Sequence, residues 1–283
     1  MLHLVTDSTA YLPTSLIEQW DIRSVPLKII INGQSVNETE LPQEEFLKLL
    51  ASLDTTPSTS QPAVGEFEDM YRELTANPDD EVVSIHISSK ISGTYVNALA
   101  AAERIESRRI TVMDSLYTTA GLGLMVIAAA QAREVGKSRA EIAAIVERMS
   151  RETASIFVVD DLEYLRKGGR INTAAKLLGS LLNIKPLLTL DEGAIKPLDK
   201  VRTKKRAVKR MLDEIEKRVG RGPVRMAATH VAAPEDVEIV AALVRERFEV
   251  VHFFICETGP AIGAHVGPGL LALGACPVGE DGF

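Results

Sequence analysis

Four short segments of the sequence are rich in side chains that can donate hydrogen bonds to an anion. Three of them, residues 6–9, 88–94 and 114–119, follow segments with the composition of β-strands, and the fourth, residues 55–62, lies in a predicted loop before a helix. Hydroxyl groups and the free backbone amides at helix starts suit a small anion such as a carboxylate. Ligands bind at the carboxyl ends of the strands in open α/β sheets, so we expect the first three segments to converge there.

The same residue types also have a purely structural interpretation. Ser, Thr and Asp are the ordinary N-caps of helices, and for any one segment capping is the simpler explanation. Capping alone is a less satisfactory explanation for the presence of all four segments. Ser92 stands out because the next residue, Gly93, permits close approach of a ligand to the backbone.

One of the five histidines has an unusual sequence context. His265 lies in the glycine-rich residues 259–269, which we expect to form an irregular loop, and loops carry function more often than core elements do. A ligand contact and a structural role both stay open for it. The other histidines lie within predicted strands, where a structural role is the default: His3, His86, His230 and His252.

The sequence lacks the common motifs for nucleotide binding, serine hydrolysis and zinc binding. No Gly-x-Gly-x-x-Gly follows the first predicted strand, and no phosphate-binding P-loop, Gly-x-Ser-x-Gly nucleophile elbow or His-Glu-x-x-His zinc motif is present. We therefore expect no nucleotide cofactor and no metal.

An enzymatic alternative remains. An acyl-ester hydrolase needs a nucleophile, a base and an acidic residue that orients the base. The residue types required are present in Ser92, in His265 and in Asp7 or Asp114. A phosphotransferase subunit is a second version, since a pocket for a carboxylate could also admit a phosphate.

Composition narrows the class of protein further. The chain of 283 residues has a formal net charge of −7, which argues against general nucleic-acid binding. Cys256 and Cys276 have no metal-ligand spacing and indicate a reducing compartment. The first residues do not resemble a signal peptide, and the most apolar predicted helix, residues 120–132, is too short to span a bilayer. We expect a cytoplasmic protein with no integral membrane association.

The predicted strands and helices that would position these residues are ordered differently in the two halves of the chain. In the first half, predicted strands alternate with helices, which favours a mainly parallel sheet covered on both faces. The strands are expected at residues 2–6, 22–31, 81–87 and 110–113, and the helices at 13–20, 43–50, 65–74, 95–105, 119–132 and 139–150.

The second half suggests paired strands with amphipathic helices, as in an α+β domain. Its strands are expected at residues 154–159, 184–190, 195–201, 224–230 and 250–255, and its helices at 173–182, 203–219 and 234–248. The fold class is therefore α/β, with an N-terminal three-layer α/β/α domain at residues 1–152 and a C-terminal α+β domain at residues 153–283.

Two segments are rich in basic residues and have not been given a role above: residues 165–170 and 200–206. The second is either a solvated face or a docking patch for an acidic partner or a phosphorylated group.

Five segments together resemble the DegV family of bacterial fatty-acid-binding proteins, in the family's order and over essentially the whole chain. They are residues 6–10, 59–62, 88–95, 164–170 and 265–269. The resemblance implies two domains with an acyl chain in a tunnel between them.

The resemblance also implies roles for individual residues. Thr59 and Ser92 would hydrogen-bond the carboxylate of one long-chain fatty acid such as palmitate, and His265 would lie beside that headgroup. The protein would not be an enzyme but a carrier in fatty-acid transport or phospholipid synthesis, presenting the acid to a separate fatty-acid kinase. Arg170 and Arg202 would contact that partner. Ala264 departs from the family pattern, in which a hydroxyl residue is common.

Overall fold

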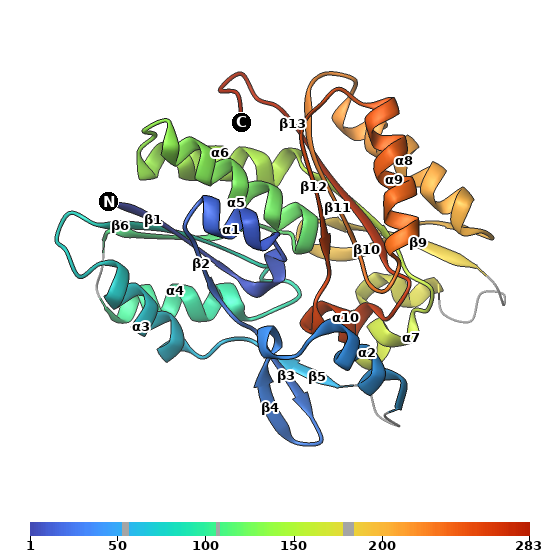
Figure 1. Ribbon diagram of the computed structural model, residues 1–283, viewed down its shortest axis with the longest axis horizontal. Helices are drawn as coiled ribbons and strands as arrows, with labels where there is room; N and C mark the ends of the chain where they lie inside the picture. Colours follow the sequence, from blue (N-terminus) through green and yellow to red (C-terminus); the bar gives the residue numbers. More distant parts are fainter. Residues whose placement is uncertain (53–56, 106–107, 178–183) are drawn as a thin grey trace.

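A parallel sheet organises the first half of the chain. The computed structural model describes residues 1–52, 57–105, 108–177 and 184–283. The strand order of this sheet is β2 (Ile22–Val25), β1 (Leu2–Asp7), β6 (Glu81–His86) and β7 (Ile110–Asp114), and all neighbours are parallel (Figure 1). Five of the six residues of β6 are buried, as expected for a strand covered on both faces.

Helices cover both faces of this sheet. The helices α3 (Val64–Leu74) and α4 (Thr94–Arg104) pack on one face and bury an apolar stripe that includes Phe67, Tyr71 and Ala98. The helices α5 (Thr119–Glu134) and α6 (Arg139–Glu152) cover the other face.

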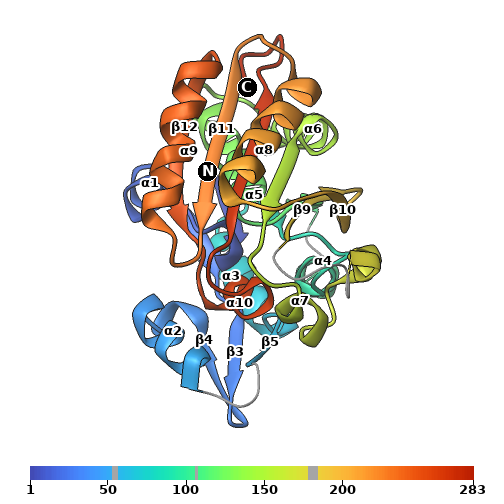
Figure 2. The same ribbon diagram turned by 90° about the vertical axis from the view of Figure 1, so that its right-hand side faces the viewer.

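The second half of the chain forms a mixed sheet of six strands. Its order is β10 (Ala194–Val201), β9 (Lys185–Asp191), β8 (Ala154–Val158), β13 (Leu271–Pro277), β11 (Val224–His230) and β12 (Val250–Glu257). Only the pair β11 and β12 is parallel within this sheet. The amphipathic helices α8 (Lys204–Val219) and α9 (Pro234–Arg247) pack on its outer face (Figure 2).

The helix α5 lies between the two sheets. It contacts β1 and β6 on one side and β8, β11 and β13 on the other, and every residue from Thr119 to Ala130 is buried. A helix that is apolar on all sides is stable in water only when it is enclosed, and the two sheets enclose it. At its start, the backbone of Ala120 and Gly121 passes so close to Gly274 of β13 that a Cβ at residue 274 would lie 3.2 Å from it.

A small antiparallel sheet completes the architecture below the parallel sheet in Figure 1. Its strand order is β4 (Gln34–Asn37), β3 (Lys28–Ile31) and β5 (Ser58–Ser60). Close to it lie α2 (Gln43–Ser52) and α10 (Pro260–Val266), and α10 also contacts α7 (Glu163–Lys167). The remaining elements are short: α1 (Thr14–Gln19) and the 3-10 helices η1 (Ser8–Ala10), η2 (Glu38–Glu40) and η3 (Asn172–Leu177).

The structure confirms the predicted fold class and corrects several elements. Residues 22–31 form two strands in different sheets because Pro26, which has no backbone N–H, interrupts the pairing. The predicted helix at residues 173–182 is a 3-10 helix as far as residue 177, and residues 178–183 lie outside the described residues. Residues 259–269 are not an irregular loop, since most of them form α10, with Pro260 at its first position. The strand β13 was not predicted.

The division of the chain into two domains stays a proposal. All strands of the parallel sheet precede residue 153 and all strands of the mixed sheet follow it, which supports domains of residues 1–152 and 153–283. In the part of the chain that the structure describes, no helix is long and apolar enough to cross a membrane.

The close contact at Gly274 generates a stability prediction. Gly274→Val should lower the free energy of unfolding by about 1–3 kcal/mol, because the new side chain would press on the backbone of α5. Gly65 in α3 is the matched control: a Cβ there meets nothing within 4 Å, so Gly65→Ala should stabilise the protein by about 0.5 kcal/mol. Urea unfolding of both variants measures the two changes. Equal stability of Gly274→Val and the unaltered protein would contradict the packing of α5 described above.

Candidate ligand-binding site

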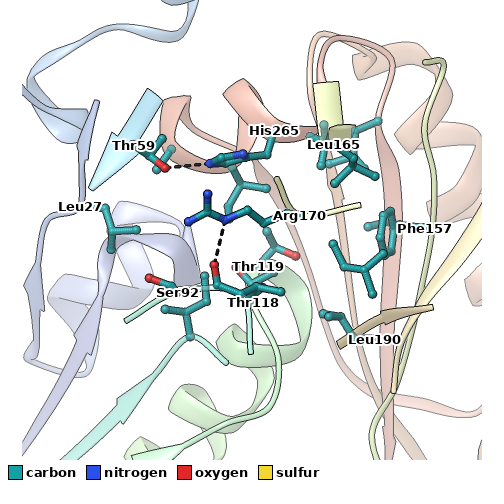
Figure 3. Close-up of a pocket in the computed structure, with 18 of the residues that line it drawn as sticks. Leu27, Thr59, Ser92, Thr118, Thr119, Phe157, Leu165, Arg170, Leu190 and His265 are labelled. Atoms are coloured by element: carbon teal, nitrogen blue, oxygen red, sulfur yellow. Dashed lines mark hydrogen bonds between the residues drawn. The ribbon is translucent and has the colours of Figure 1, made fainter. Parts of the chain in front are cut away.

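A cavity lies between the two sheets, beside the start of α5 and under α10 (Figure 3). The space between the atoms there amounts to about 810 Å³ when the open solvent at its mouth is counted. Both halves of the chain line it. The first half contributes Leu27, Thr59, Ser60, Gln61, Ile87, Ile91, Ser92, Thr118 and Thr119, and the second half contributes twelve residues that include Phe157, Leu165, Arg170, Leu190, Ile195 and His265.

The cavity has a polar side and an apolar side. In Figure 3, Thr59 and Ser92 lie on one side, together with the apolar Leu27, and Phe157 and Leu190 lie on the other, with the side chain of Arg170 between them. Such an arrangement suits an amphiphile with one polar end.

Thr59 and His265 are hydrogen-bonded to each other at the polar side. The distance between Thr59 Oγ1 and His265 Nε2 is 2.7 Å, although the residues are 206 positions apart in the sequence. Burial, and to a smaller extent the positive charge of Arg170, lowers the pKa of His265 from 6.5 to about 4. The imidazole is therefore neutral at neutral pH.

The tautomer of His265 follows from its surroundings. Its Nδ1 atom is buried and has no hydrogen-bond partner among the described residues. A buried N–H without an acceptor is rarer than a buried acceptor without a donor, so we place the proton on Nε2. Nε2 then donates to Thr59 Oγ1, and the hydroxyl proton of Thr59 is free for a ligand. Nδ1 lies against Gly168, where any Cβ would overlap it.

Ser92 lies just before the N-cap residue of α4, which is Gly93. Its Oγ atom accepts a hydrogen bond from the backbone N–H of Thr94 at 3.3 Å, and lies 2.8 Å from the Oγ1 atom of Thr94, at the start of α4. Ser92 also lines the cavity. Gly93, however, makes room for a protein side chain: a Cβ there would lie 2.8 Å from Nε2 of Gln61.

The two arginines predicted as partner contacts have different surroundings. Arg170 lines the cavity and donates hydrogen bonds to two backbone oxygens, from Nη1 to Gly168 at 2.7 Å and from Nε to Ile91 at 3.2 Å. Arg202 is exposed just after β10 and does not line the cavity. Ala264 is fully buried against Ile29 and Phe46, so it does not face the polar side.

The expected convergence of three hydroxyl-rich segments is only partly right. Ser92, Thr118 and Thr119 do meet at the cavity, but residues 6–9 and 114–115 do not line it. The carboxylate of Asp7 instead accepts hydrogen bonds from Thr9 and from the backbone N–H of Ile87 at 2.9 Å. These segments satisfy buried polar groups of the protein itself.

The residues proposed for a hydrolase are not assembled into a catalytic set. Among the described hydrogen bonds, none joins Ser92 to His265, and Asp7 Oδ2 contacts Nδ1 of His86 at 3.1 Å instead. The Nε2 atom of His86 in turn lies 2.6 Å from Oγ of Ser84, but this chain of groups is fully buried and away from the cavity. No group of three potential metal ligands occurs in the described part of the chain.

Some cavity residues were missed by the sequence reasoning. Gln61, Thr118 and Thr119 were inside the segments singled out, but their roles were not distinguished. Thr118 Oγ1 is buried without a partner among the described residues, and Thr119 has a positive φ of 48°. Strained backbone of this kind is concentrated at functional sites, but no sequence pattern marks it outside glycine. The apolar wall residues Phe157 and Leu190 lie in predicted strands and were not singled out.

Comparisons with known proteins match nearly the whole chain. A family model described as "Uncharacterised protein, DegV family" matches residues 1–278. A DegV domain-containing protein of Streptomyces coelicolor is 38% identical over 272 residues, which cover 95% of this chain and 96% of the relative.

Two solved structures have the same fold. A DegV family protein of Thermus thermophilus, described as fatty-acid binding, has a TM-score of 0.89 and 33% identity and covers 98% of this chain and 99% of its own. DegV of Bacillus subtilis, described as a fatty acid binding protein, has a TM-score of 0.87 and 34% identity, with 97% and 98% covered. From the family model and these relatives, we conclude that the chain belongs to the DegV family.

Proposed function

We propose that the protein binds one long-chain fatty acid in the cavity, with the carboxylate held by Thr59 and Ser92. The observation that carries the proposal is the division of one cavity into a polar side with hydrogen-bond donors and an apolar side. The descriptions of the Thermus thermophilus and Bacillus subtilis proteins as fatty-acid binding support it.

The acyl tail would supply most of the affinity. Each buried methylene contributes ~0.8 kcal/mol, so a tail of about fifteen methylenes gives a gross gain of ~12 kcal/mol. The loss of translational and conformational freedom on binding reduces this gain substantially. Leucine, isoleucine and phenylalanine side chains of both halves of the chain surround the space that the tail would fill.

The headgroup contacts would supply orientation. Thr59 and Ser92 would each donate a hydrogen bond to the carboxylate. The hydroxyl proton of Thr59 is available for this because Thr59 accepts its hydrogen bond from His265. A hydrogen bond to a charged acceptor contributes roughly 1.5–3 kcal/mol. The positive charge of Arg170 in the cavity wall favours the ionised acid, because an unpaired buried carboxylate would be protonated.

A carrier role follows from this mode of binding. We infer that the protein is not itself an enzyme but presents the acid to a separate fatty-acid kinase in phospholipid synthesis. The exposed Arg202 is suited to contact that partner, and Arg170 to link partner and ligand. The two cysteines are buried free thiols, which is compatible with the cytoplasm as the site of action.

The double variant Thr59→Ala, Ser92→Ala tests the headgroup contacts. Loss of two donors should weaken palmitate binding by roughly a hundredfold, measured by isothermal titration calorimetry. Ser89→Ala is the matched control, because Ser89 lies in the same loop as Ser92 but does not line the cavity. Unchanged affinity in the double variant would remove both residues from the site.

Burial of neutral His265 makes a prediction about pH. The unfolded chain takes up a proton at this residue below pH 6.5, whereas the folded protein resists it down to about pH 4. The wild-type protein should therefore lose stability relative to His265→Gln as the pH falls through this window, by up to about 3 kcal/mol. Urea unfolding of both proteins at about pH 7.5 and about pH 5 gives the difference. A difference independent of pH would contradict a buried neutral imidazole.

We expect Leu190 to limit the length of the acyl tail. It lines the cavity and also a second hollow, which Leu116, Tyr117 and Arg218 help to form. Leu190→Ala should therefore shift the preference to longer saturated acids and Leu190→Phe to shorter ones, because the first enlarges and the second fills the apolar side. Affinities for a series of saturated acids measure the shift. The same preference in both variants would place the tail elsewhere.

A further inference from the structure

The short helix that carries His265 is capped by a carboxyl group from a distant part of the chain. Glu38 of η2 is only 2% exposed. Its Oε2 atom accepts hydrogen bonds from the backbone N–H of Ala261 and from the hydroxyl of Tyr11, both at 2.8 Å, and its Oε1 atom accepts one from Ser8. Ala261 is the second residue of α10, 223 positions away from Glu38.

Tyr11 extends this cap to a second amide. Its hydroxyl donates to Glu38 and accepts a hydrogen bond from the backbone N–H of Ile262 at 3.1 Å. The N–H groups of a first helical turn have no partner within the helix, and the N-cap residue Gly259 has no side chain to supply one. Glu38 and Tyr11 therefore satisfy both amides from outside the helix. The fit is close, since a Cβ at Gly259 would lie 2.6 Å from the ring of Tyr11.

The cap is connected to the cavity in two directions. Ala261, Ile262, His265 and Val266 of α10 all line the cavity, so a shift of this helix would move them together. Ser8, the third donor to Glu38, accepts a hydrogen bond from the backbone N–H of Leu27 at 2.9 Å, and Leu27 also lines the cavity. From Leu27 the chain enters β3, which pairs with β5 and registers Ile29 opposite Thr59.

We propose that Glu38 is a positioning residue of the site, which through Tyr11, Ser8 and α10 sets the distance between Thr59 and His265. Thr59 and His265 reach the cavity on separate elements, β5 and α10. Glu38 is bonded directly to α10 and is connected to β5 through Ser8, Leu27 and β3. For its effect on ligand affinity, this inference rests on the proposed fatty-acid binding.

The chemistry of the group fits this role. Three donors converge on the two oxygens of Glu38, and a carboxylate can accept from all three. Burial raises the pKa of Glu38 from 4.5 to about 7, with the charge of Asp7 adding to the effect, while the bonds from Ser8, Ala261 and Tyr11 oppose it. The test is therefore made at about pH 8.5, where the carboxyl is ionised.

Tyr11→Phe is the main variant, and the chain offers a matched control. Tyr71→Phe also removes a buried hydroxyl, one that donates to Ser84 at 2.8 Å in the network of His86, away from α10. Both variants should lower the melting temperature. Only Tyr11→Phe should move the ¹⁵N resonances of the His265 imidazole in the ligand-free protein, and only it should weaken palmitate binding, by about fivefold to tenfold.

Glu38→Gln is the second variant, since an amide keeps one acceptor oxygen and most of the shape. It should also move the His265 resonances. Unchanged His265 resonances in both Tyr11→Phe and Glu38→Gln, or equal changes in Tyr71→Phe, would overturn the proposal. If the unaltered protein bound no fatty acid, the proposed function would fail, but the resonances of His265 would still decide whether Glu38 positions it.

Discussion

The burial of α5 between two sheets is the constraint on which the rest of the structure depends. Its apolar residues contact the parallel sheet on one side and the mixed sheet on the other. Either sheet alone would leave one apolar face of α5 exposed to water. Gly274 allows the mixed sheet to approach the start of the helix at backbone distance. The cavity lies at that same end, where Thr118 and Thr119 begin α5. The site is thus a product of how the two halves of the chain meet.

A cavity of this kind must keep an anionic group away from bulk water without leaving its own polar groups unpaired. In the proposed mode of binding, neutral donors and one positive charge would meet this requirement. His265 stays neutral because it is buried beside Arg170, and its hydrogen bond to Thr59 leaves the hydroxyl proton of Thr59 available. The carboxyl group of Glu38, in a neighbouring segment, does not line the cavity and has three hydrogen-bond donors of its own. In the proposed mode of binding, the carboxylate of the ligand and the carboxyl group of Glu38 would therefore have separate sets of hydrogen-bond donors.

Sequence reasoning captured what depends on local pattern and missed what depends on long-range contact. The alternation of strands and helices predicted the parallel sheet, and the strands predicted at residues 184–190 and 195–201 form the antiparallel pair β9 and β10. The strand β13 was not predicted because its alanines and glycine have low strand propensity. Tertiary packing against α5 overrides that preference. The glycines around α10 suggested a loop, because its caps come from Glu38 and Tyr11 and cannot be read locally.

The same distinction holds for the site. Ser92 and Thr59 were singled out because hydroxyl clusters and family segments mark them, and both line the cavity. Residues 6–9 looked equally suited to an anion, yet their partners are the buried His86, Ile87 and Glu38. Glu38 itself was not suspected, since a glutamate in a polar segment resembles any exposed one until the fold buries it.

Native mass spectrometry of the protein mixed with palmitate tests the central claim most directly. One cavity that encloses one tail and one headgroup predicts a single added mass of one fatty acid per chain, lost when the protein is denatured. The adduct should be nearly absent in the Thr59→Ala, Ser92→Ala double variant at the same palmitate concentration. An unaltered protein that forms no adduct, or that takes up several acids without preference for one, would contradict the account.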